Sequence, residues 1–255
     1  MKRILLPVAV ALMLMLGVVP AGAILNGGPD GTNHPYVGMV TDLNFVCSGA
    51  AVSPTKFITA AHCFDTGPGT PVLVTFDPEG FDDFPAGFVS GTWTPHSDWC
   101  IACGNGLVGF DLNDVAVVIL DAPIVLPEYG KLPSLGQAAA QPQKKGVSLV
   151  GYGVQVRIKE FVDEAFTRFF APSQLVQSND RISSDFLKLT ANPSQGKGGA
   201  CFGDSSGPVI LEGAGLGNDT ILGVNSFGTN VNCAGHGYSN RIDIPATQSF
   251  ISSVN

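Results

Sequence analysis

The chain has 255 residues, 32 of them glycine and 18 proline, and a formal net charge of −8 at pH 7. A chain of this length can form one large β domain or two small ones with a substantial core. Its acidic balance excludes the broad basic surface that nucleic-acid binding requires, so we expect no nucleic-acid partner. Glycine and proline spread along the chain, short β-branched runs and scarce helical periodicity predict many strands joined by tight turns.

The first 23 residues predict a secretory signal peptide. Lys2 and Arg3 precede an apolar run, Ile4–Val19, and Ala21-Gly22-Ala23 forms a small-x-small cleavage site. The apolar run is shorter than the roughly 20 residues that span a bilayer, and no other stretch has that character. We therefore expect an exported protein that has no membrane attachment once the signal is removed. Removing residues 1–23 takes away two of the 13 basic residues and none of the 21 acidic ones, which leaves a formal charge of −10.

The predicted elements are strands, with one helix near the end of the chain. That helix spans Ile244–Val254, where Pro245 stands near the start and apolar residues recur four apart. The polar segment Leu132–Lys145 is the best linker candidate, which predicts an N-terminal unit, residues 24–135, and a C-terminal unit, residues 136–255. Strands are predicted at 37–41, 46–52, 57–60, 72–76, 115–120, 147–152, 186–190, 209–211 and 221–226.

Two adjacent serines stand in the stretch ACFGDSSGPV, Ala200–Val209. The segment Gly203–Gly207 fits G-x-S-x-G, the nucleophile turn of the α/β-hydrolases. That fold requires the chain order serine, acid, histidine and an alternation of strands with helices. Little chain follows Ser205 and no such alternation is present, so the sequence argues against an α/β-hydrolase.

Two further motifs lie upstream of the serines. ITAAHC, residues 58–63, places His62 at the end of an apolar strand, and Asp114 opens the apolar run DVAVVIL. Together with GDSSGP, residues 203–208, they resemble the three signatures of the chymotrypsin/trypsin family of serine proteases, in that family's order. The resemblance covers essentially the whole mature chain. It implies an all-β fold of two packed antiparallel β-barrels with a short C-terminal helix and an active site in the cleft between the barrels.

The resemblance further implies a secreted serine endopeptidase that acts on protein or peptide substrates as a monomer, without cofactor or metal. A serine hydroxyl becomes an effective nucleophile when a neutral imidazole accepts its proton, and His62 would pass that proton to the leaving amine. Asp114 would orient His62 and stabilise its imidazolium form. The family match selects Ser205 as nucleophile and assigns the oxyanion hole to the backbone N–H groups of Gly203 and Ser205.

Several residues compete with these assignments. Asp111 is the rival to Asp114, but it does not adjoin the apolar strand. Ser206 is the rival nucleophile and occupies a position where the family usually has glycine. A side chain there is expected to crowd the leaving-group side and so to affect rate and substrate range. The remaining histidines, His34, His96 and His236, are expected to be ordinary surface or core residues.

Six cysteines in an exported chain predict disulfides, although six cysteines allow 15 connectivities. The resemblance implies two pairs, Cys47–Cys63 beside the histidine strand and Cys201–Cys233 beside the specificity pocket. Cys100 and Cys103 remain, and their C-x-x-C spacing also fits a redox motif or, with His96 nearby, half of a metal site. A fourth metal ligand is not evident, so a local disulfide is preferred.

The specificity pocket is assigned by resemblance alone. Gly199 falls at its base beside Ala200, where trypsin-like members carry an aspartate, and Gly237 falls in a wall. Ser226-Phe227-Gly228 corresponds to the strand along which substrate lies, and its serine would also support Asp114. An alignment slip of one residue near Gly237 stays open. An open, uncharged pocket favours large apolar or aromatic residues before the scissile bond.

The resemblance also implies an activation step. In the family a new amino terminus folds inward, and its ammonium group pairs with the aspartate before the nucleophile, here Asp204. Ile24 comes directly after the predicted cleavage site at Ala23, so we expect export itself to produce the activating terminus. Cleavage a few residues away followed by trimming, or a surface position for Ile24, stays open.

Two other functions stay open on the sequence. One is a catalytically silent binding protein on the same fold, and the other is an esterase. The triple Asn218-Asp219-Thr220 fits a glycosylation sequon, which recurs by chance and receives no role.

Overall fold

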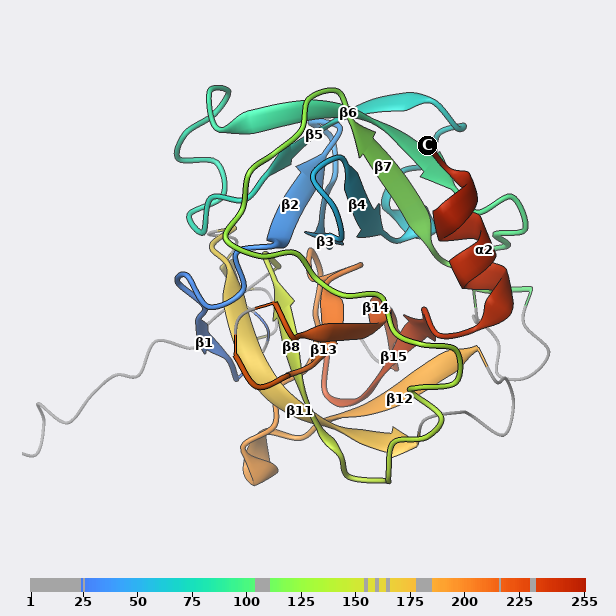
Figure 1. Cartoon of the computed structure of the whole chain (residues 1–255). Coiled ribbons are helices and arrows are strands. Elements are labelled where there is room, and N and C mark those ends of the chain that lie inside the picture. The colour runs from blue at the N-terminus through green and yellow to red at the C-terminus, as the bar shows by residue number, and fades with distance from the viewer. Residues whose placement is uncertain are drawn as a thin grey trace, which may run out of the picture.

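The computed structural model of the chain describes residues 24, 26–103, 111–153, 156–158, 161–163, 166–177, 185–215, 217–229 and 233–255. The predicted signal peptide lies outside these residues. Figure 1 shows two barrels stacked one above the other, with the single labelled α-helix along one side. The predicted fold class, two packed antiparallel β-barrels, is confirmed.

The first barrel is a closed ring of six antiparallel strands in the order β2-β3-β4-β7-β6-β5. Five of these strands fall on predicted apolar runs, because side chains on one face of each strand fill the barrel interior. The strands are β2 (Val37–Thr41), β3 (Val46–Ala51), β4 (Lys56–Thr59), β5 (Thr70–Thr75), β6 (Phe88–Pro95) and β7 (Ala116–Leu120).

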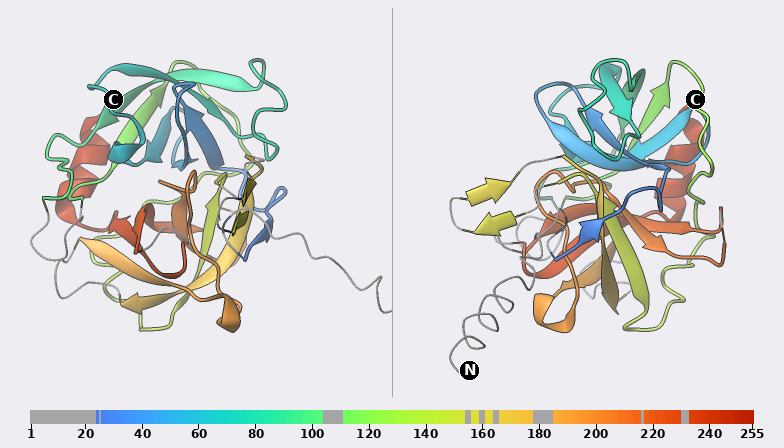
Figure 2. Two further views of the ribbon diagram at one scale, coloured as in Figure 1. Left: turned by 180° about the vertical axis from the view of Figure 1, so that it is seen from behind. Right: turned by 90° about the vertical axis from the view of Figure 1, so that its left-hand side faces the viewer.

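The second barrel closes because β8 pairs with both β13 and β11, which completes the ring β8-β11-β12-β15-β14-β13. The short strand β1 (Gly28–Pro29) extends this sheet at β11. A hairpin of β9 (Val156–Ile158) and β10 (Phe161–Asp163) projects from the side of the molecule (Figure 2). The ring strands are β8 (Gly146–Gly151), β11 (Phe169–Gln177), β12 (Phe186–Ala191), β13 (Pro208–Leu211), β14 (Thr220–Gly228) and β15 (Gly235–Arg241).

Six strands lie where no strand was predicted, namely β6, β11 and β15 in the two rings and the short strands β1, β9 and β10. In β6, Gly91 permits close approach of β7, since a Cβ there would lie 2.8 Å from the Ile119 carbonyl oxygen. In β11, Pro172 is registered only with Ser148 of β8, so its missing N–H breaks no ladder on the other side. Tertiary pairing overrides the weak local strand preference of these segments.

Three buried clusters account for the core. One fills the first barrel around Trp93, and one fills the second barrel around Leu149. A third, which includes Tyr36 and Tyr152, draws residues from both barrels and joins them. Among the residues that the structure describes, no member of this third cluster lines the pocket presented below.

The helix α2 (Pro245–Ser253) confirms the predicted C-terminal helix, with proline in its first turn. It lies beside the first barrel, where the ring of Phe250 is 4.7 Å from that of His96, and the Lys56 ammonium donates to the carbonyl of Ile251 at 2.9 Å. The remaining short elements are the 3₁₀ turns η1 (Ala61–Cys63) and η2 (Pro193–Gln195).

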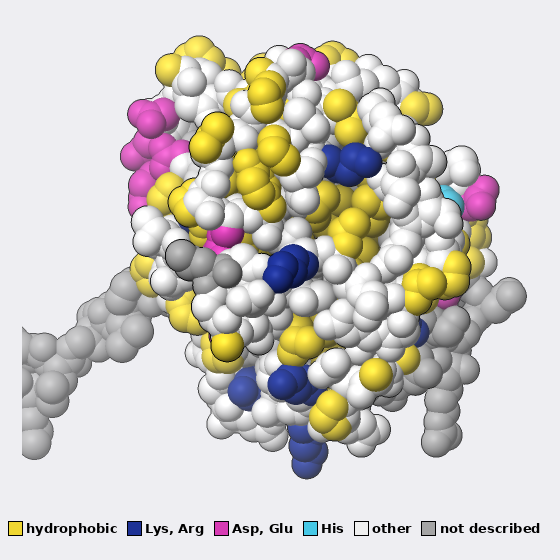
Figure 3. Space-filling view, viewed as in Figure 1, with side chains coloured by type: hydrophobic (Ala, Val, Ile, Leu, Met, Phe, Trp, Pro, Cys, Tyr) yellow, Lys and Arg dark blue, Asp and Glu magenta, His cyan; other side chains and the backbone are white. Residues whose placement is uncertain are grey.

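The surface carries few charges, in line with a composition of 13% charged residues. On the face shown in Figure 3, hydrophobic side chains gather over the first barrel and basic side chains are scattered singly. Within the described ranges, no helix has the length and apolar character needed to cross a bilayer.

Candidate active site

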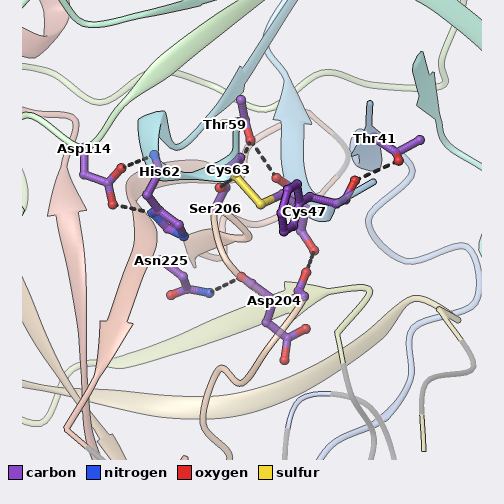
Figure 4. The surroundings of a disulfide bond; sticks show 12 residues. Thr41, Cys47, Thr59, His62, Cys63, Asp114, Asp204, Ser206 and Asn225 are labelled. Atoms are coloured by element: carbon purple, nitrogen blue, oxygen red, sulfur yellow. Dashed lines mark hydrogen bonds and ion pairs between the residues drawn. A yellow bond between two sulfur atoms is a disulfide. The ribbon is translucent and has the colours of Figure 1, made fainter. Parts of the chain in front are cut away.

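His62 and Asp114 meet because the strands that carry them are neighbours. β4 leads into the turn η1 that holds His62, and Asp114 comes just before β7, the antiparallel partner of β4. The imidazole Nδ1 lies 2.7 Å from Oδ2 of Asp114, and the backbone N–H of His62 donates to Oδ1 at 2.9 Å. The hydroxyl of Ser226 donates to Oδ2 as well. Figure 4 shows this pair beside the Cys47–Cys63 disulfide.

Asp114 is fully buried, while a quarter of the His62 side chain is exposed. Because an ionised carboxylate only accepts hydrogen bonds, Nδ1 of His62 carries a proton, and Nε2 is left as the acceptor. The Asp114 carboxylate therefore fixes the tautomer and the orientation of the imidazole ring. The carboxylate is itself held by the backbone N–H of His62 and the hydroxyl of Ser226.

The electrostatics of this pair favour the charged form of both partners. Burial lowers the pKa of His62, but the charge and hydrogen bond of Asp114 and the charge of Asp111 outweigh it, so the pKa is raised above 6.5. Burial raises the pKa of Asp114, but His62 and Ser226 outweigh it, so the pKa is lowered. The imidazolium that forms when His62 takes a proton is thus stabilised.

Ser205 lies in a turn built from unusual backbone conformations. Gly203 has φ of +84° and Ser206 has φ of +71°. The backbone N–H groups of the alternate residues Asp204 and Ser206 donate to carbonyls, at 3.0 and 2.7 Å. Those of Gly203 and Ser205 have no hydrogen-bond partner among the described residues. Two free N–H groups two residues apart can serve an oxyanion that develops beside the serine hydroxyl.

His62 and Ser205 line the same pocket, which has a volume of about 500 Å³. In the part of the chain that the structure describes, no hydrogen bond joins the Ser205 hydroxyl to the imidazole. Such a bond is often long in unliganded enzymes and tightens only with bound substrate. The two groups therefore share one cavity without an established contact.

The residues assigned to the specificity pocket all line this cavity. Its described lining contains no Asp, Glu, Lys or Arg side chain, so the cavity is uncharged apart from His62. Phe227 stacks on Tyr238 with ring centroids 5.0 Å apart and forms an aromatic wall. The predicted lining residues are Gly199, Ala200, Ser226, Phe227, Gly228 and Gly237, and the sequence missed Leu149, Leu189, Thr190, Ala191, Phe202, Asn225, Thr229 and Tyr238.

Ile24 and Asp204 are also brought together. Ile24 is fully buried in the core of the second barrel, and its backbone N–H donates to the Asp204 carboxylate. The same carboxylate accepts from the backbone N–H groups of Gly153 at 2.8 Å and Cys201 at 3.0 Å. Burial raises the pKa of Asp204 to about 7 against the effect of these three donors. The carboxylate therefore lies in a dry site that would favour a cation.

The rival residues are accounted for by their contacts. Asp111 does not bond His62, and its carboxylate accepts from the backbone N–H of Ala102 at 2.6 Å. The Ser206 side chain is fully buried, with Oγ 2.8 Å from Sγ of Cys63 (Figure 4). The Ser206 side chain therefore does not line the pocket, and its effect on the leaving-group side stays a prediction.

Three disulfides are formed, Cys47–Cys63, Cys100–Cys103 and Cys201–Cys233. The sulfurs of Cys47 and Cys63 and a ring nitrogen of His62 lie within 4.8 Å of one another, a spacing that suits a metal ion. Both sulfurs are already in the disulfide, so they are not thiolates and do not fit a metal.

The other histidines do not line the pocket. His34 is buried, with Nδ1 2.6 Å from Oδ1 of Asp30. The other carboxylate oxygen, Oδ2, accepts from Nε of the buried Arg168 at 3.0 Å. His96 is buried against α2, and His236 is exposed. They match the ordinary core and surface roles expected of them.

Comparison with known proteins gives consistent results. A family model described as Trypsin matches residues 27–251. The clotting factor G beta subunit of Tachypleus tridentatus is 24% identical over 230 residues, which covers 83% of this chain and 74% of that protein. Brachyurin of Leptuca pugilator is 24% identical over 214 residues, which covers 80% and 85%. The solved structure of human heparin binding protein aligns with a TM-score of 0.63 and 19% identity over 89% of this chain and 95% of that one, which shows a shared fold.

Proposed function

Because this chain belongs to the trypsin family of serine proteases, we propose that it is a secreted serine endopeptidase that uses Ser205, His62 and Asp114. The observation that carries the proposal is the buried hydrogen-bonded pair of His62 and Asp114 in the same pocket as Ser205. A buried carboxylate that orients an imidazole beside a serine is the arrangement that nucleophilic acyl transfer requires.

The reaction runs in two halves. Nε2 of His62 takes the hydroxyl proton as Oγ of Ser205 bonds to the carbonyl carbon of the substrate, and the carbonyl oxygen becomes an oxyanion held by the N–H groups of Gly203 and Ser205. The imidazolium then gives its proton to the leaving amine, the C–N bond breaks, and an ester on Ser205 remains. A water molecule, deprotonated by His62, attacks that ester and releases the acid and the free serine.

The preferred residue before the scissile bond is large and apolar or aromatic. The uncharged lining offers no counter-ion to a buried Lys or Arg head group, whose desolvation costs several kcal/mol. Apolar surface contributes about 25 cal/mol per Å² removed from water, and the wall of Phe227 and Tyr238 supplies such surface. A peptide library in which cleavage after Arg or Lys dominates would contradict this preference.

Activation follows from a free amino terminus at Ile24. The Ile24 nitrogen already lies on the Asp204 carboxylate, so a free ammonium there forms a buried ion pair next to the nucleophile. Pairing raises the pKa of the ammonium and lowers that of the Asp204 carboxyl, which burial raises to about 7. The ion pair is therefore complete between the two pKa values and fades when pH rises through that of the ammonium or falls through that of the carboxyl. We expect a variant that keeps one residue before Ile24 to lose activity, and full activity in that variant would rule the mechanism out.

Secretion is supported by the leader motif of residues 1–23 and by three disulfides, which persist in oxidising compartments. Amino-terminal sequencing of material from the culture medium tests both export and the terminus at Ile24.

The central experiment is labelling with a serine-directed phosphonate followed by peptide mapping. We expect one adduct, on Ser205, and none in the Ser205→Ala variant. A folded sample whose amino terminus is shown to be Ile24 and that takes up no label would instead be a silent binding protein on this fold. Hydrolysis of casein or of a peptide amide separates a protease from an esterase, because the esterase cleaves only the ester analogue.

A further inference from the structure

Ser48 in β3 is fully buried, and its backbone N–H, its carbonyl and its hydroxyl all form hydrogen bonds. Its backbone N–H donates to the carbonyl of Ser205 and its hydroxyl donates to the carbonyl of Gly203, both at 2.9 Å. The hydroxyl accepts from the backbone N–H of Tyr152 at 2.9 Å, and the Ser48 carbonyl accepts from the hydroxyl of Thr59 at 3.0 Å.

These contacts tie the two barrels together at the nucleophile turn. Ser48 and Thr59 belong to the first barrel, and Thr59 is three residues before His62. Gly203 and Ser205 form the turn on the second barrel, and Tyr152 directly follows β8. One serine thus connects the strand that leads to the histidine with the carbonyl groups on either side of Asp204.

The fit around the hydroxyl is close. A Cβ built on Gly151 would lie 3.0 Å from the Ser48 Oγ, so only glycine at that position admits the hydroxyl without displacement. A hydroxyl supplies one donor and acceptor lone pairs, and here the donor and one lone pair are both used. Its removal leaves the carbonyl of Gly203 and the N–H of Tyr152 buried without that partner.

We propose that Ser48 is a positioning residue that aims the oxyanion-hole N–H groups of Gly203 and Ser205, an inference that rests on the proposed protease function. Gly203 has the greatest conformational freedom in the turn, with φ of +84°. Holding its carbonyl and that of Ser205 fixes the peptide units on both sides of the Asp204–Ser205 peptide, which carries the Ser205 N–H. The Gly203 N–H lies on the other side of the Gly203 Cα from the held carbonyl, so the same bond restricts its rotation. The aim of both donors then depends on the opposite barrel.

The test compares Ser48→Ala with Thr41→Val. The hydroxyl of Thr41, also fully buried in the first barrel, donates to the Phe45 carbonyl at 2.7 Å and accepts from the Leu43 N–H at 2.8 Å. Both substitutions therefore delete a buried hydroxyl with one backbone acceptor and one backbone donor and keep nearly the same volume. Only one of them reaches the nucleophile turn.

We expect Ser48→Ala to lower kcat on a peptide amide about 10-fold to 100-fold with little change in KM, because misaimed donors weaken only the transition state. A peptide boronate, which forms the tetrahedral adduct, should lose affinity by a similar factor, and a non-reactive peptide product that fills the pocket should keep its affinity. Thr41→Val should change the melting temperature comparably and leave kcat and both affinities near the wild-type values.

Equal kinetic effects in the two variants, or a loss confined to KM, would overturn the proposal. If Ser48→Ala does not fold, Ser48→Gly is measured in its place, and failure of both to fold assigns Ser48 a structural role only. A wild-type protein that takes no phosphonate label and cleaves nothing refutes the proposed protease function first, and this inference with it. An active wild type with an unaffected Ser48→Ala refutes this inference alone.

Discussion

The two barrels supply the pocket in different ways. The first barrel supplies side chains, an imidazole and a buried carboxylate held 2.7 Å apart between neighbouring strands. The second barrel supplies one hydroxyl and, around it, mostly backbone, namely two unpaired N–H groups and a pocket with glycine at three of its predicted lining positions. Side-chain chemistry depends on which residue is present, whereas backbone chemistry depends on the conformation that the neighbouring residues impose.

The two barrels differ most in the contacts that hold their parts of the site in place. Asp114 is fixed by its own hydrogen bonds to His62 and Ser226. The turn at Gly203 is fixed from outside, by Gly153 packed against it and by Ser48 from the other barrel. A substitution among the site residues of the first barrel should therefore remove a chemical group. A substitution in the nucleophile turn of the second barrel should instead displace the backbone N–H groups.

The largest effect is expected where a chemical group changes. Asp114→Asn keeps the shape of the side chain but no longer favours the Nδ1–H tautomer of His62, so kcat should fall about 10⁴-fold. Asp111→Asn is the matched control, because Asp111 bonds Ala102 rather than His62, and its kcat at the pH optimum should change less than about 10-fold. Steady-state kinetics on one peptide amide measures both. A larger loss in the Asp111 variant would reverse the assignment of the two carboxylates.

A smaller loss is expected where backbone is displaced. A Cβ on Gly203 would lie 2.8 Å from the Cα of Gly153, in a conformation with φ of +84°. Gly203→Ala should shift the oxyanion donors and lower kcat about 10²-fold to 10³-fold. Gly69→Ala is the control, because Gly69 has φ of +91° and open space around it. If the two variants lose equal activity, strain alone explains the effect and the placement of the Gly203 N–H is not the cause.

The same division explains what could be predicted from the sequence. His62 and Asp114 sit at the ends of apolar strands, and a strand's period and its terminal polar residue are local properties that the sequence displays. The pairing of β4 with β7, which joins these two residues, follows once the fold class is known.

The missed features all depend on contacts between distant segments. The role of the Ser48 hydroxyl carries no local signal, because its two partners, Tyr152 and Gly203, are 104 and 155 residues away in the chain. Asn225 and Tyr238 line the pocket where β14 and β15 pair with a register shift, which the local sequence does not display. The contact of Ser206 with the Cys63 sulfur involves a left-handed backbone that the residue type disfavours and a partner 143 residues away, so the sequence carries no signal for it.

The dependence of kcat/KM on pH tests whether Asp111 acts on His62 through its charge, without a direct hydrogen bond. The charge of Asp111 contributes to the raised pKa of His62 without a hydrogen bond between them. Because neutral His62 is the active base, kcat/KM should rise with pH through an apparent pKa above 6.5. Asp111→Asn removes a negative charge, destabilises the imidazolium and lowers that pKa by less than about one unit. Below this pKa, the variant should thus retain a larger fraction of its plateau kcat/KM than the wild type does. A shift of the apparent pKa to a higher value in the variant would contradict this electrostatic role.

The smallest effect is expected at Ser206, where the second barrel's backbone meets the first barrel's disulfide. Ser206→Ala removes the hydroxyl that lies 2.8 Å from the Cys63 sulfur and keeps the left-handed strain, so it should destabilise the fold by about 1 kcal/mol. Ser206→Gly removes the hydroxyl and also relieves the backbone strain of about 1–2 kcal/mol. The greater freedom of glycine in the unfolded chain costs about 0.5–1 kcal/mol, so Ser206→Gly should be slightly more stable than Ser206→Ala. Thermal denaturation orders the two variants. Because the side chain faces the disulfide, both variants should keep kcat/KM within about twofold of the wild type, on amides and esters with small or bulky leaving groups. A selective gain in kcat/KM for bulky leaving groups in Ser206→Gly would show that the side chain reaches the cleft.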